Sequence, residues 1–420
     1  MTIEKIDTLV VGAGQSGIAM SEHLTALGVP HLVLERNRVA EQWRTGRWDS
    51  LVANGPAWHD RFPNMEFDDV APDVFPPKDR MARYFEDYAR MIDAPIRTNV
   101  EVKRVIRNTG RPGFLVSTSQ GVIEAQRIVA ATGPFQVPNV PRIVPEDSGI
   151  AQIHSSAYRN PGQLAEGAVL VVGGGASGSQ IAEELHRAGR RVFLSVGEHY
   201  RPPRSYRQRD YVWWLGVLGK WDEITTTPKK KHVAFAVSGY DGGKTIDFRR
   251  FGHAGITILG SAESFRDGVL KLAPDLAANI AEGDRAYLDV LREADAYVER
   301  NGVDLPPEPE AWDIASDPDC IADPILELDL KAQNVTTIIW ATGFRFDFGW
   351  LEVDAFDAQG MPFHKRGISA ETGIYFLGLP ELTNRASSFI YGCWYDAKYI
   401  ATHIVVQRNY VAYRRASDPG

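Results

Sequence analysis

Short apolar runs alternate with amphipathic stretches along the first part of the chain. Residues 8–11 (TLVV) lead into Gly12, and a stretch with apolar positions three or four residues apart continues to Gly28. A second apolar run, residues 31–34, ends at Glu35. Short apolar runs bounded by turn signals are typical of buried strands, and three-to-four spacing is typical of a helix. The pattern therefore predicts a strand, a helix and a second strand.

The same unit returns 161 residues later. Residues 9–28 and 170–189 are identical at ten of twenty aligned positions, and an apolar run that ends at Ser195 follows the second copy. Both copies carry GxGxxG, where the glycines permit a tight turn, close approach of the backbone to a pyrophosphate, and close packing of helix and strand. The positions are Gly12, Gly14 and Gly17, then Gly173, Gly175, Ser177 and Gly178. Two copies are too few for a solenoid, so they predict two dinucleotide-binding domains.

The residues after the second strand of each unit differ, and this predicts two different dinucleotides. Glu35 is placed to accept hydrogen bonds from the hydroxyls of an unphosphorylated adenosine ribose. In the second copy we assign Ser195 to the corresponding place, and Arg201 and Arg204 follow it. The missing acid and the arginines favour a 2′-phosphate, and hence NADPH. The alternative is that the arginines form a solvated basic loop.

Composition limits the classes of partner and of chemistry. With 44% hydrophobic and 24% charged residues, the 420-residue chain is typical of folded globular proteins, and its formal charge of −8 does not favour nucleic acid or an anionic membrane surface. Cys320 and Cys393 stand alone, which excludes a disulfide framework and a dithiol redox centre. The chain has no apolar run long enough for membrane insertion, and its start is unlike a signal peptide. We expect a cytoplasmic protein without a metal site.

Two further segments carry a family resemblance. Ala130–Pro134 and Trp340–Phe344 each place Thr-Gly after an apolar strand, in a fixed order relative to the glycine motifs. Together these four motifs resemble the flavin-containing and Baeyer-Villiger monooxygenases. The resemblance implies an α/β, glutathione-reductase-like fold with two Rossmann-like domains. It places an FAD domain at residues 1–158 and 325–420, with an NADPH domain at residues 159–324 inserted between them.

The resemblance also implies site residues. Asn54, in Asn54-Gly55-Pro56, is similar to the family's asparagine that holds the flavin peroxide and NADP⁺ together, although an Asn before Gly-Pro is also common in turns. His59 is the second catalytic candidate; the alternative is that it caps a loop. The segment around Trp43 resembles the one that follows the FAD diphosphate. The implied cofactor contacts, besides the glycine motifs, are Arg36, Gln42, Trp43, Arg44, Asn54, Val102, Thr132, Gly133, Thr342, Gly343 and Ser388.

The implied activity is an NADPH-dependent FAD monooxygenase. Reduced FAD would form a C4a-(hydro)peroxide with molecular oxygen and oxygenate a small organic substrate at nitrogen, sulfur or a carbonyl carbon. The Baeyer-Villiger fingerprint is incomplete: His154 and Tyr158 keep its last spacing, but Ser148 and Ile150 replace its Phe and Gly. The alternatives are an oxidase or electron-transfer flavin reductase, and a non-catalytic flavoprotein. A homodimer is an expectation from the resemblance alone.

The segment inserted after the second glycine motif departs from a minimal Rossmann domain. Residues 205–250 contain a short aromatic stretch, Tyr211–Leu215, and the lysine run Lys229–Lys231. We favour aromatic side chains packed over the domain junction and a solvated lysine turn over a membrane-surface helix. Residues 275–302 have a long helical pattern, and we expect a pair of surface helices there.

Overall fold

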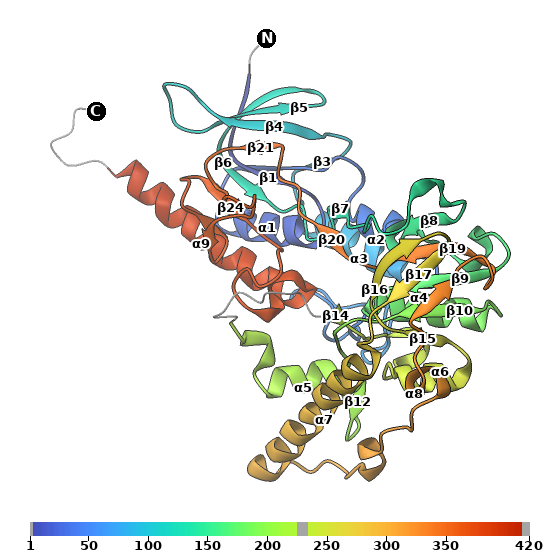
Figure 1. Ribbon diagram of the computed structural model, residues 1–420. Helices are drawn as coiled ribbons and strands as arrows, with labels where there is room; N and C mark the ends of the chain where they lie inside the picture. The colour runs from blue at the N-terminus through green and yellow to red at the C-terminus, as the bar shows by residue number, and fades with distance from the viewer. Residues whose placement is uncertain (1–2, 225–233, 414–420) are drawn as a thin grey trace.

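The computed structural model describes residues 3–224 and 234–413, so the lysine run Lys229–Lys231 lies outside the described residues. Two lobes, each built on a parallel sheet, lie side by side (Figure 1). The chain starts in the first lobe, crosses to the second, and returns to the first for its last helix, α9 (Ile390–Ala412). None of the described helices is both long and apolar enough to cross a membrane.

The first sheet has a parallel centre and an antiparallel flank. The order β24-β6-β1-β2-β3 is parallel throughout. The first part of β6 also pairs antiparallel with β5, and β5 pairs antiparallel with β4. The short strand β21 extends the sheet beyond β4, and β23 and β22 extend it beyond β24. The strands are β1 (Glu4–Val11), β2 (His31–Leu34), β3 (Ile96–Arg97), β4 (Val102–Arg107), β5 (Phe114–Thr118), β6 (Gly121–Ala130), β21 (Leu351–Glu352), β22 (His364–Lys365), β23 (Ile368–Ser369) and β24 (Ile374–Phe376).

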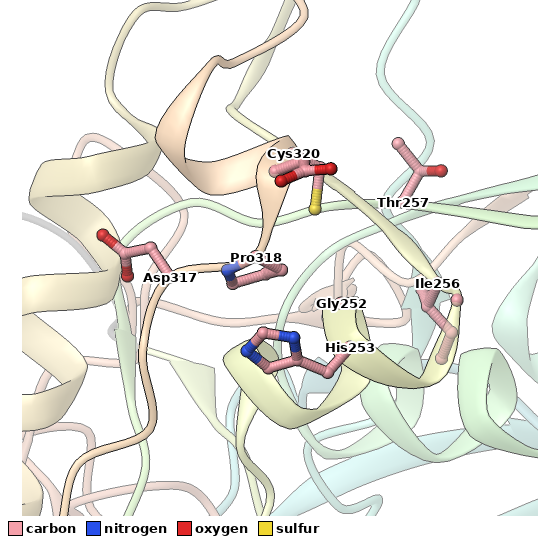
Figure 2. Close-up of a pocket in the computed structure, with 9 residues that line it drawn as sticks. Gly252, His253, Ile256, Thr257, Asp317, Pro318 and Cys320 are labelled. Atoms are coloured by element: carbon pink, nitrogen blue, oxygen red, sulfur yellow. The ribbon is translucent and has the colours of Figure 1, made fainter.

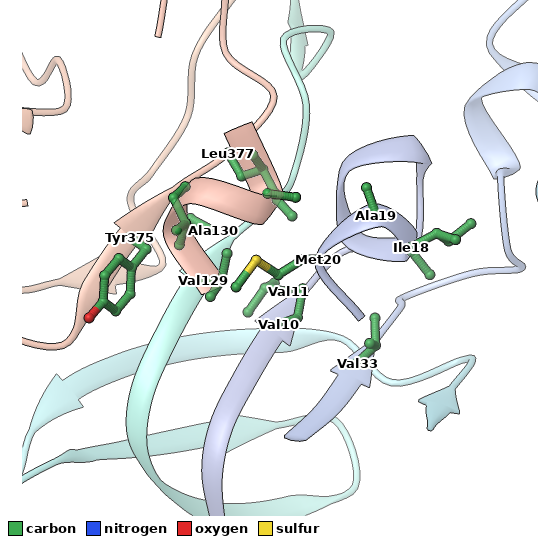
Figure 3. Close-up of a cluster of buried hydrophobic side chains, with 14 of the residues drawn as sticks. Val10, Val11, Ile18, Ala19, Met20, Val33, Val129, Ala130, Tyr375 and Leu377 are labelled. Atoms are coloured by element: carbon green, nitrogen blue, oxygen red, sulfur yellow. The ribbon is translucent and has the colours of Figure 1, made fainter. Parts of the chain in front are cut away.

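The core of the first lobe lies where β1, β6 and β24 meet the helices. Val10 and Val129 are fully buried, and Ile18 and Met20 pack against the strands from α1 (Gln15–Ala26) (Figure 3). The last helix, α9, and α3 (Lys78–Met91) complete the same cluster. Central strands of a parallel sheet are covered on both faces, which is why the predicted apolar run before Gly12 does not alternate with polar residues.

The second sheet, β15-β10-β9-β19-β8, is parallel throughout. Helix α4 (Ala176–Arg187) covers one face, where Val169 and Val171 lie. A small antiparallel sheet covers the other face, where Leu170 and Val172 lie. The five strands are β8 (Ala151–His154), β9 (Ala168–Val172), β10 (Val192–Ser195), β15 (Thr257–Leu259) and β19 (Val335–Trp340), and the covering sheet consists of β16 (Ala262–Arg266), β17 (Val269–Leu272) and β18 (Glu327–Asp329).

The crossings between the lobes differ from the predicted boundaries at residues 158 and 325. Strands β8 and β19 were expected in the first domain, but both pair within the second sheet. The chain crosses through β7 (Val137–Pro138) and returns through β20 (Phe344–Arg345), and these two strands pair antiparallel with each other. Pro and Gly clusters locate turns, whereas this exchange depends on pairing between strands almost 190 residues apart, which no local signal reports.

The inserted segment folds below the second sheet as drawn in Figure 1. Its aromatic residues are packed, as expected: Trp214 on α5 (Tyr211–Val217) is fully buried and Trp221 nearly so. The predicted helix pair at residues 275–302 is wrong, because α7 (Leu276–Asn301) is one continuous helix. The remaining elements are β11 (His199–Tyr200), β12 (Ser205–Tyr206), β13 (Arg209–Asp210), β14 (Ala234–Phe235), α2 (Glu41–Thr45), α6 (Phe248–Ala254) and α8 (Asp319–Ala322).

Two buried histidines predict that acid destabilises the fold. Burial lowers the pKa of His154 and of His199, which are 5% and 1% exposed. Below the pKa of about 6.5 for an unfolded histidine, the unfolded chain takes up protons that the folded chain does not. The free energy of unfolding therefore falls as pH falls, by up to about 1.4 kcal/mol per pH unit for each histidine that stays neutral.

Urea unfolding midpoints at pH 7.5 and 5.5 test this expectation. We expect a lower midpoint at pH 5.5, and a smaller difference between the two pH values in a His199→Gln variant. A midpoint that is flat or rises on acidification would contradict the assignment of these side chains as buried and neutral.

Candidate functional site

The first glycine turn joins β1 to α1 and leaves one position open. Gly12 has φ +107°, and a Cβ there would lie 2.6 Å from the carbonyl oxygen of Ala131. A Cβ on Gly17 would overlap the carbonyl oxygen of Gly12. A Cβ on Gly14 would meet nothing within 4 Å. Gly12 and Gly17 are thus required by the fold itself, and Gly14 borders free space at the start of a helix.

The second glycine turn repeats this geometry in the other lobe. Gly173 has φ +123° and faces the carbonyl of Ala341, a Cβ on Gly178 would overlap the carbonyl oxygen of Gly173, and Gly175, the N-cap residue of α4, is half-buried. Neither α1 nor α4 has a side chain bonded to its N-terminal amides. Uncapped backbone N–H groups at a helix N-terminus attract anions, so both turns can hold a diphosphate. Ser177 lies in the first turn of α4, half-buried.

Glu35 lies at the end of β2 beside the first glycine turn. Its Oε2 accepts a hydrogen bond from the Ala13 N–H and its Oε1 from the Asn37 N–H, each at 2.9 Å. The Val100 N–H donates to the Glu35 carbonyl, which brings the start of β4, Val102, near the same edge. Arg36 points to solvent. A carboxylate has about four acceptor positions, so Glu35 retains capacity for a ligand hydroxyl.

The strand register shifts the predicted counterpart of Glu35 by one residue. Val11 pairs with Leu34 in the first lobe, and its repeat partner Val172 pairs with Ser195 in the second. Ser195 therefore corresponds to Leu34; it is buried and donates to the carbonyl of Gly260 at 2.8 Å. Val196 takes the place of Glu35. As predicted, no acid stands at that place, but the residue there is the apolar Val196 and not a serine.

The structure does not bring Arg201 and Arg204 together with Ser195 as free cations. Both are at least 95% buried. Arg201 pairs with Asp284 at 2.6 Å, and Arg204 pairs through two nitrogens with Asp210. Asp210 follows Arg204 by only six residues, but Asp284 lies 83 residues after Arg201. The sequence therefore offers no sign of the pair between Arg201 and Asp284.

The two Thr-Gly segments lie together at the crossings between the lobes. Phe135 and Phe344, which follow or end the two segments, have ring centroids 5.1 Å apart. Asn139 bonds the second segment, because its N–H donates to the carbonyl of Gly343 and its carbonyl accepts from the hydroxyl of Thr342. His154 also bonds the Gly343 carbonyl, at 2.9 Å, and its other ring nitrogen accepts from the Ser156 N–H. On the other segment, Gln136 donates to the hydroxyl oxygen of Thr132 and to the carbonyl of Gly133.

The segment around Trp43 contains a cation that sequence reasoning missed. The Arg47 guanidinium lies over the ring of Phe135 at 4.6 Å and of Trp43 at 5.9 Å, and burial lowers its pKa to about 10. No carboxylate of the described residues pairs with it. Its neighbour Arg44 pairs with Glu86. A half-buried cation without a carboxylate suits an anionic ligand; the only sequence signal was its place among aromatic residues.

The start of α1 contacts the 3₁₀ turn Arg385–Ser388, which precedes the last helix. Gln15, at the start of α1, donates through Nε2 to the carbonyl of Ser388 at 3.1 Å. This contact brings Ser388 to the open side of the first glycine turn. Gln42 lies on α2 and is exposed.

Asn54 lies between the two lobes. It is exposed, and its side-chain oxygen accepts a hydrogen bond from Gln180 of α4 at 3.1 Å. Its backbone carbonyl accepts from Arg204 at 2.7 Å. A residue of the first lobe is therefore held from the helix that starts at the second glycine turn. Gln180 was another residue that sequence reasoning missed.

His59 lies in an aromatic cluster rather than at a loop end. Its ring stacks on both Trp221 and Tyr391, with centroids 5.2 Å from each, and those two rings also contact each other at 6.4 Å. Its Nδ1 bonds Asp60 Oδ1 at 2.9 Å, and Asp60 Oδ2 accepts from the Gly55 N–H. Nε2 is buried without a partner among the described residues. The structure thus places His59 next to the Asn54 turn.

A pocket of about 380 Å³ lies elsewhere, lined by α6, β15 and α8 (Figure 2). His253 and Cys320 face it from opposite sides. Ile256 and Thr257 precede or begin β15, so the pocket lies at the amino end of the second sheet. Dinucleotides bind at the carboxyl ends of parallel strands, which separates this pocket from the glycine turns.

Comparisons with known proteins agree with this geometry. Residues 9–215 match the family described as pyridine nucleotide-disulphide oxidoreductase. The chain is 31% identical over 404 residues to "Uncharacterized oxidoreductase CzcO-like" of Geobacillus kaustophilus, which covers 95% of this chain and 98% of that protein. It is 32% identical over 410 residues to the probable indole-3-pyruvate monooxygenase YUCCA4 of Arabidopsis thaliana, which covers 95% and 90%. The chain belongs to the flavin-containing monooxygenase superfamily.

The fold agrees with this membership. A flavin-containing monooxygenase from Stenotrophomonas maltophilia superposes with a TM-score of 0.67 at 18% identity, covering 97% of this chain and all of that one. The predicted two-domain dinucleotide-binding fold is confirmed. As a member of the superfamily, the chain is a flavin-dependent oxidoreductase.

Proposed function

We propose that this superfamily member is an NADPH-dependent FAD monooxygenase that transfers one oxygen atom from O₂ to a small organic substrate at nitrogen, sulfur or a carbonyl carbon. The observation that carries the proposal is the position of Asn54. Its amide belongs to the FAD lobe by sequence but is bonded to the second dinucleotide-binding helix. An oxygenase needs such a group, because both cofactors and the oxygen must meet in one place.

Both dinucleotide sites fit the cofactors proposed for them. The free space beside Gly14 and the uncapped N-termini of α1 and α4 suit a diphosphate in each lobe. Glu35 would hold the adenosine ribose of FAD. At the equivalent place Val196 neither accepts from a 2′-hydroxyl nor repels a 2′-phosphate, which supports NADPH over NADH.

The residues of the chain position and shield the chemistry. Bound FAD supplies hydride acceptance and the reaction of the reduced ring with oxygen. The N-terminus of α1 would hold the diphosphate, and Asn54 offers an exposed amide that does not titrate. The aromatic side chains stacked on His59 exclude water from that side of the Asn54 turn.

Anaerobic reduction of the purified protein tests the function. We expect NADPH to bleach the flavin faster than NADH at equal concentration, because Val196 at the place of the ribose acid does not repel a 2′-phosphate. Rapid mixing with oxygen should give a transient spectrum that matches neither oxidised nor reduced flavin. Direct return to oxidised flavin, with release of hydrogen peroxide and no substrate able to suppress it, would favour an oxidase or reductase. No reduction by either nucleotide would favour a non-catalytic flavoprotein.

A further inference from the structure

Gln180 is buried on α4, two residues after the last glycine of the second turn. Its Nε2 lies 3.1 Å from the Asn54 side-chain oxygen and 2.6 Å from the carbonyl oxygen of Val237. The side chain therefore bridges three segments: the Asn54 turn of the first lobe, the helix of the second glycine turn, and the inserted segment.

These two contacts determine which way both amides face. A backbone carbonyl can only accept, so the Gln180 atom that contacts Val237 must be the amide nitrogen. The same nitrogen contacts Asn54, and its two hydrogens are then used by two acceptors. The Asn54 atom that meets it must be the oxygen. Asn54 Nδ2 faces away from Gln180 and has no partner within the described part of the chain.

The backbone of the Asn54 turn is held from the same side. Arg204 donates to the Asn54 carbonyl at 2.7 Å and is itself clamped by both carboxylate oxygens of Asp210. On the other side of the turn, the Gly55 N–H donates to Asp60. The side-chain orientation of Asn54 therefore depends on Gln180, while its backbone has anchors of its own.

We infer that Gln180 is a positioning residue that presents the exposed Asn54 side chain as a hydrogen-bond donor, and that it ties this orientation to the second dinucleotide-binding helix. The inference rests on the proposed function for its catalytic meaning. The group that Asn54 meets must then be an acceptor, such as a carbonyl or an oxygen atom of the reacting species. Any movement of α4 on dinucleotide binding would be transmitted to the Asn54 amide by the Gln180 side chain.

Two substitutions separate orientation from packing. Gln180→Leu keeps the approximate volume but removes both donors. Gln180→Glu has only acceptors, so Asn54 must rotate to donate Nδ2 to it and turn its oxygen outward instead. We expect product formed per NADPH to fall about tenfold to a hundredfold in Gln180→Glu, with flavin reduction changed less than about threefold. Glu183→Gln, one turn further along α4, is the matched control and should resemble the parent protein.

A readout other than activity tests the positioning itself. In protein labelled with ¹⁵N on asparagine, we expect the side-chain amide signal of Asn54, identified by its loss in Asn54→Ala, to shift in Gln180→Leu and to stay in place in Glu183→Gln, because Gln180→Leu removes the hydrogen bond to that amide. An unshifted signal would overturn the inference whatever reaction the protein catalyses. A shifted signal in a protein that forms no oxygenated product would keep the positioning role and reject the proposed function.

A double-mutant cycle tests whether Gln180 acts through Asn54. In an Asn54→Ala background, Gln180→Leu should cause no further loss of product per NADPH, because the residue it positions is gone. Losses that multiply independently would overturn the inference. A merely structural role for Gln180 would instead lower flavin reduction and oxygenation together, by similar factors.

Discussion

Replacing Asn54 by Asp is expected to lower the rate of substrate oxygenation by about 10²–10³-fold, the loss seen when one preorganised donor is removed from a reaction site. The carboxylate keeps the size of the amide and still accepts the hydrogen bond from Gln180. It replaces the outward Nδ2 donor by an oxygen, and it adds a negative charge where negative charge develops. Flavin reduction by NADPH should change less than about threefold, because the side chain is not part of either glycine turn.

The measurement is oxygenated product and hydrogen peroxide formed per NADPH consumed. We expect the peroxide to rise as product falls. Asn301→Asp is the control, since it makes the same chemical change at the end of α7, where the Asn301 side chain bonds the Tyr297 carbonyl and not a residue of the Asn54 turn. Retained product yield in Asn54→Asp would show that the donor is not needed, and would remove the main support for oxygenation.

Gly14→Ala and Gly17→Ala are expected to fail in different ways although they lie in one turn. The Gly14 methyl would enter the free space of the diphosphate site, so the fold should persist while FAD affinity falls about 10- to 100-fold, the equivalent of about 1–3 kcal/mol of overpacking. The Gly17 methyl would overlap the Gly12 carbonyl, which forces α1 away from β1 and costs about 3 kcal/mol or more of stability.

Flavin content per chain and the melting temperature of the flavin-free protein separate the two outcomes. Gly14→Ala should lose flavin with an unchanged melting temperature, and Gly17→Ala should lower the melting temperature. Gly175→Ala is the matched control in the second lobe, where flavin content should stay normal and the KM for NADPH should rise. A flavin-replete Gly14→Ala protein would place the diphosphate elsewhere.

Much of the fold could be predicted from the sequence because its signals are local. The glycine turns, the strands that flank them and the helices after them follow from apolar runs and GxGxxG spacing. The exchange of β8 and β19 between lobes could not be predicted, because parallel pairing joins strands distant in sequence. The continuity of α7 was missed, because a 26-residue helix is longer than most and a glycine, Gly283, lies inside it.

The candidate site was predictable only where backbone geometry decides it. Gly12, Gly17 and Glu35 lie where the motif places them, since a turn and a strand end determine their positions. Arg201 and Arg204 were predicted as phosphate ligands, yet both are taken up by carboxylates, and for Arg201 the partner is on α7. Gln180 and Arg47 were missed, because a buried amide between lobes and a cation without a carboxylate are defined by contacts rather than by spacing.

The paired crossing strands have an evolutionary consequence. The chain leaves the first lobe at β7 and comes back at β20, and the two strands are hydrogen-bonded neighbours. The second lobe is thus connected to the first by two adjacent strands, and a homologous lobe could replace it by recombination at only two positions in the gene. Such a replacement would exchange the coenzyme preference in one step, provided that the incoming helix carries the glutamine that contacts Asn54.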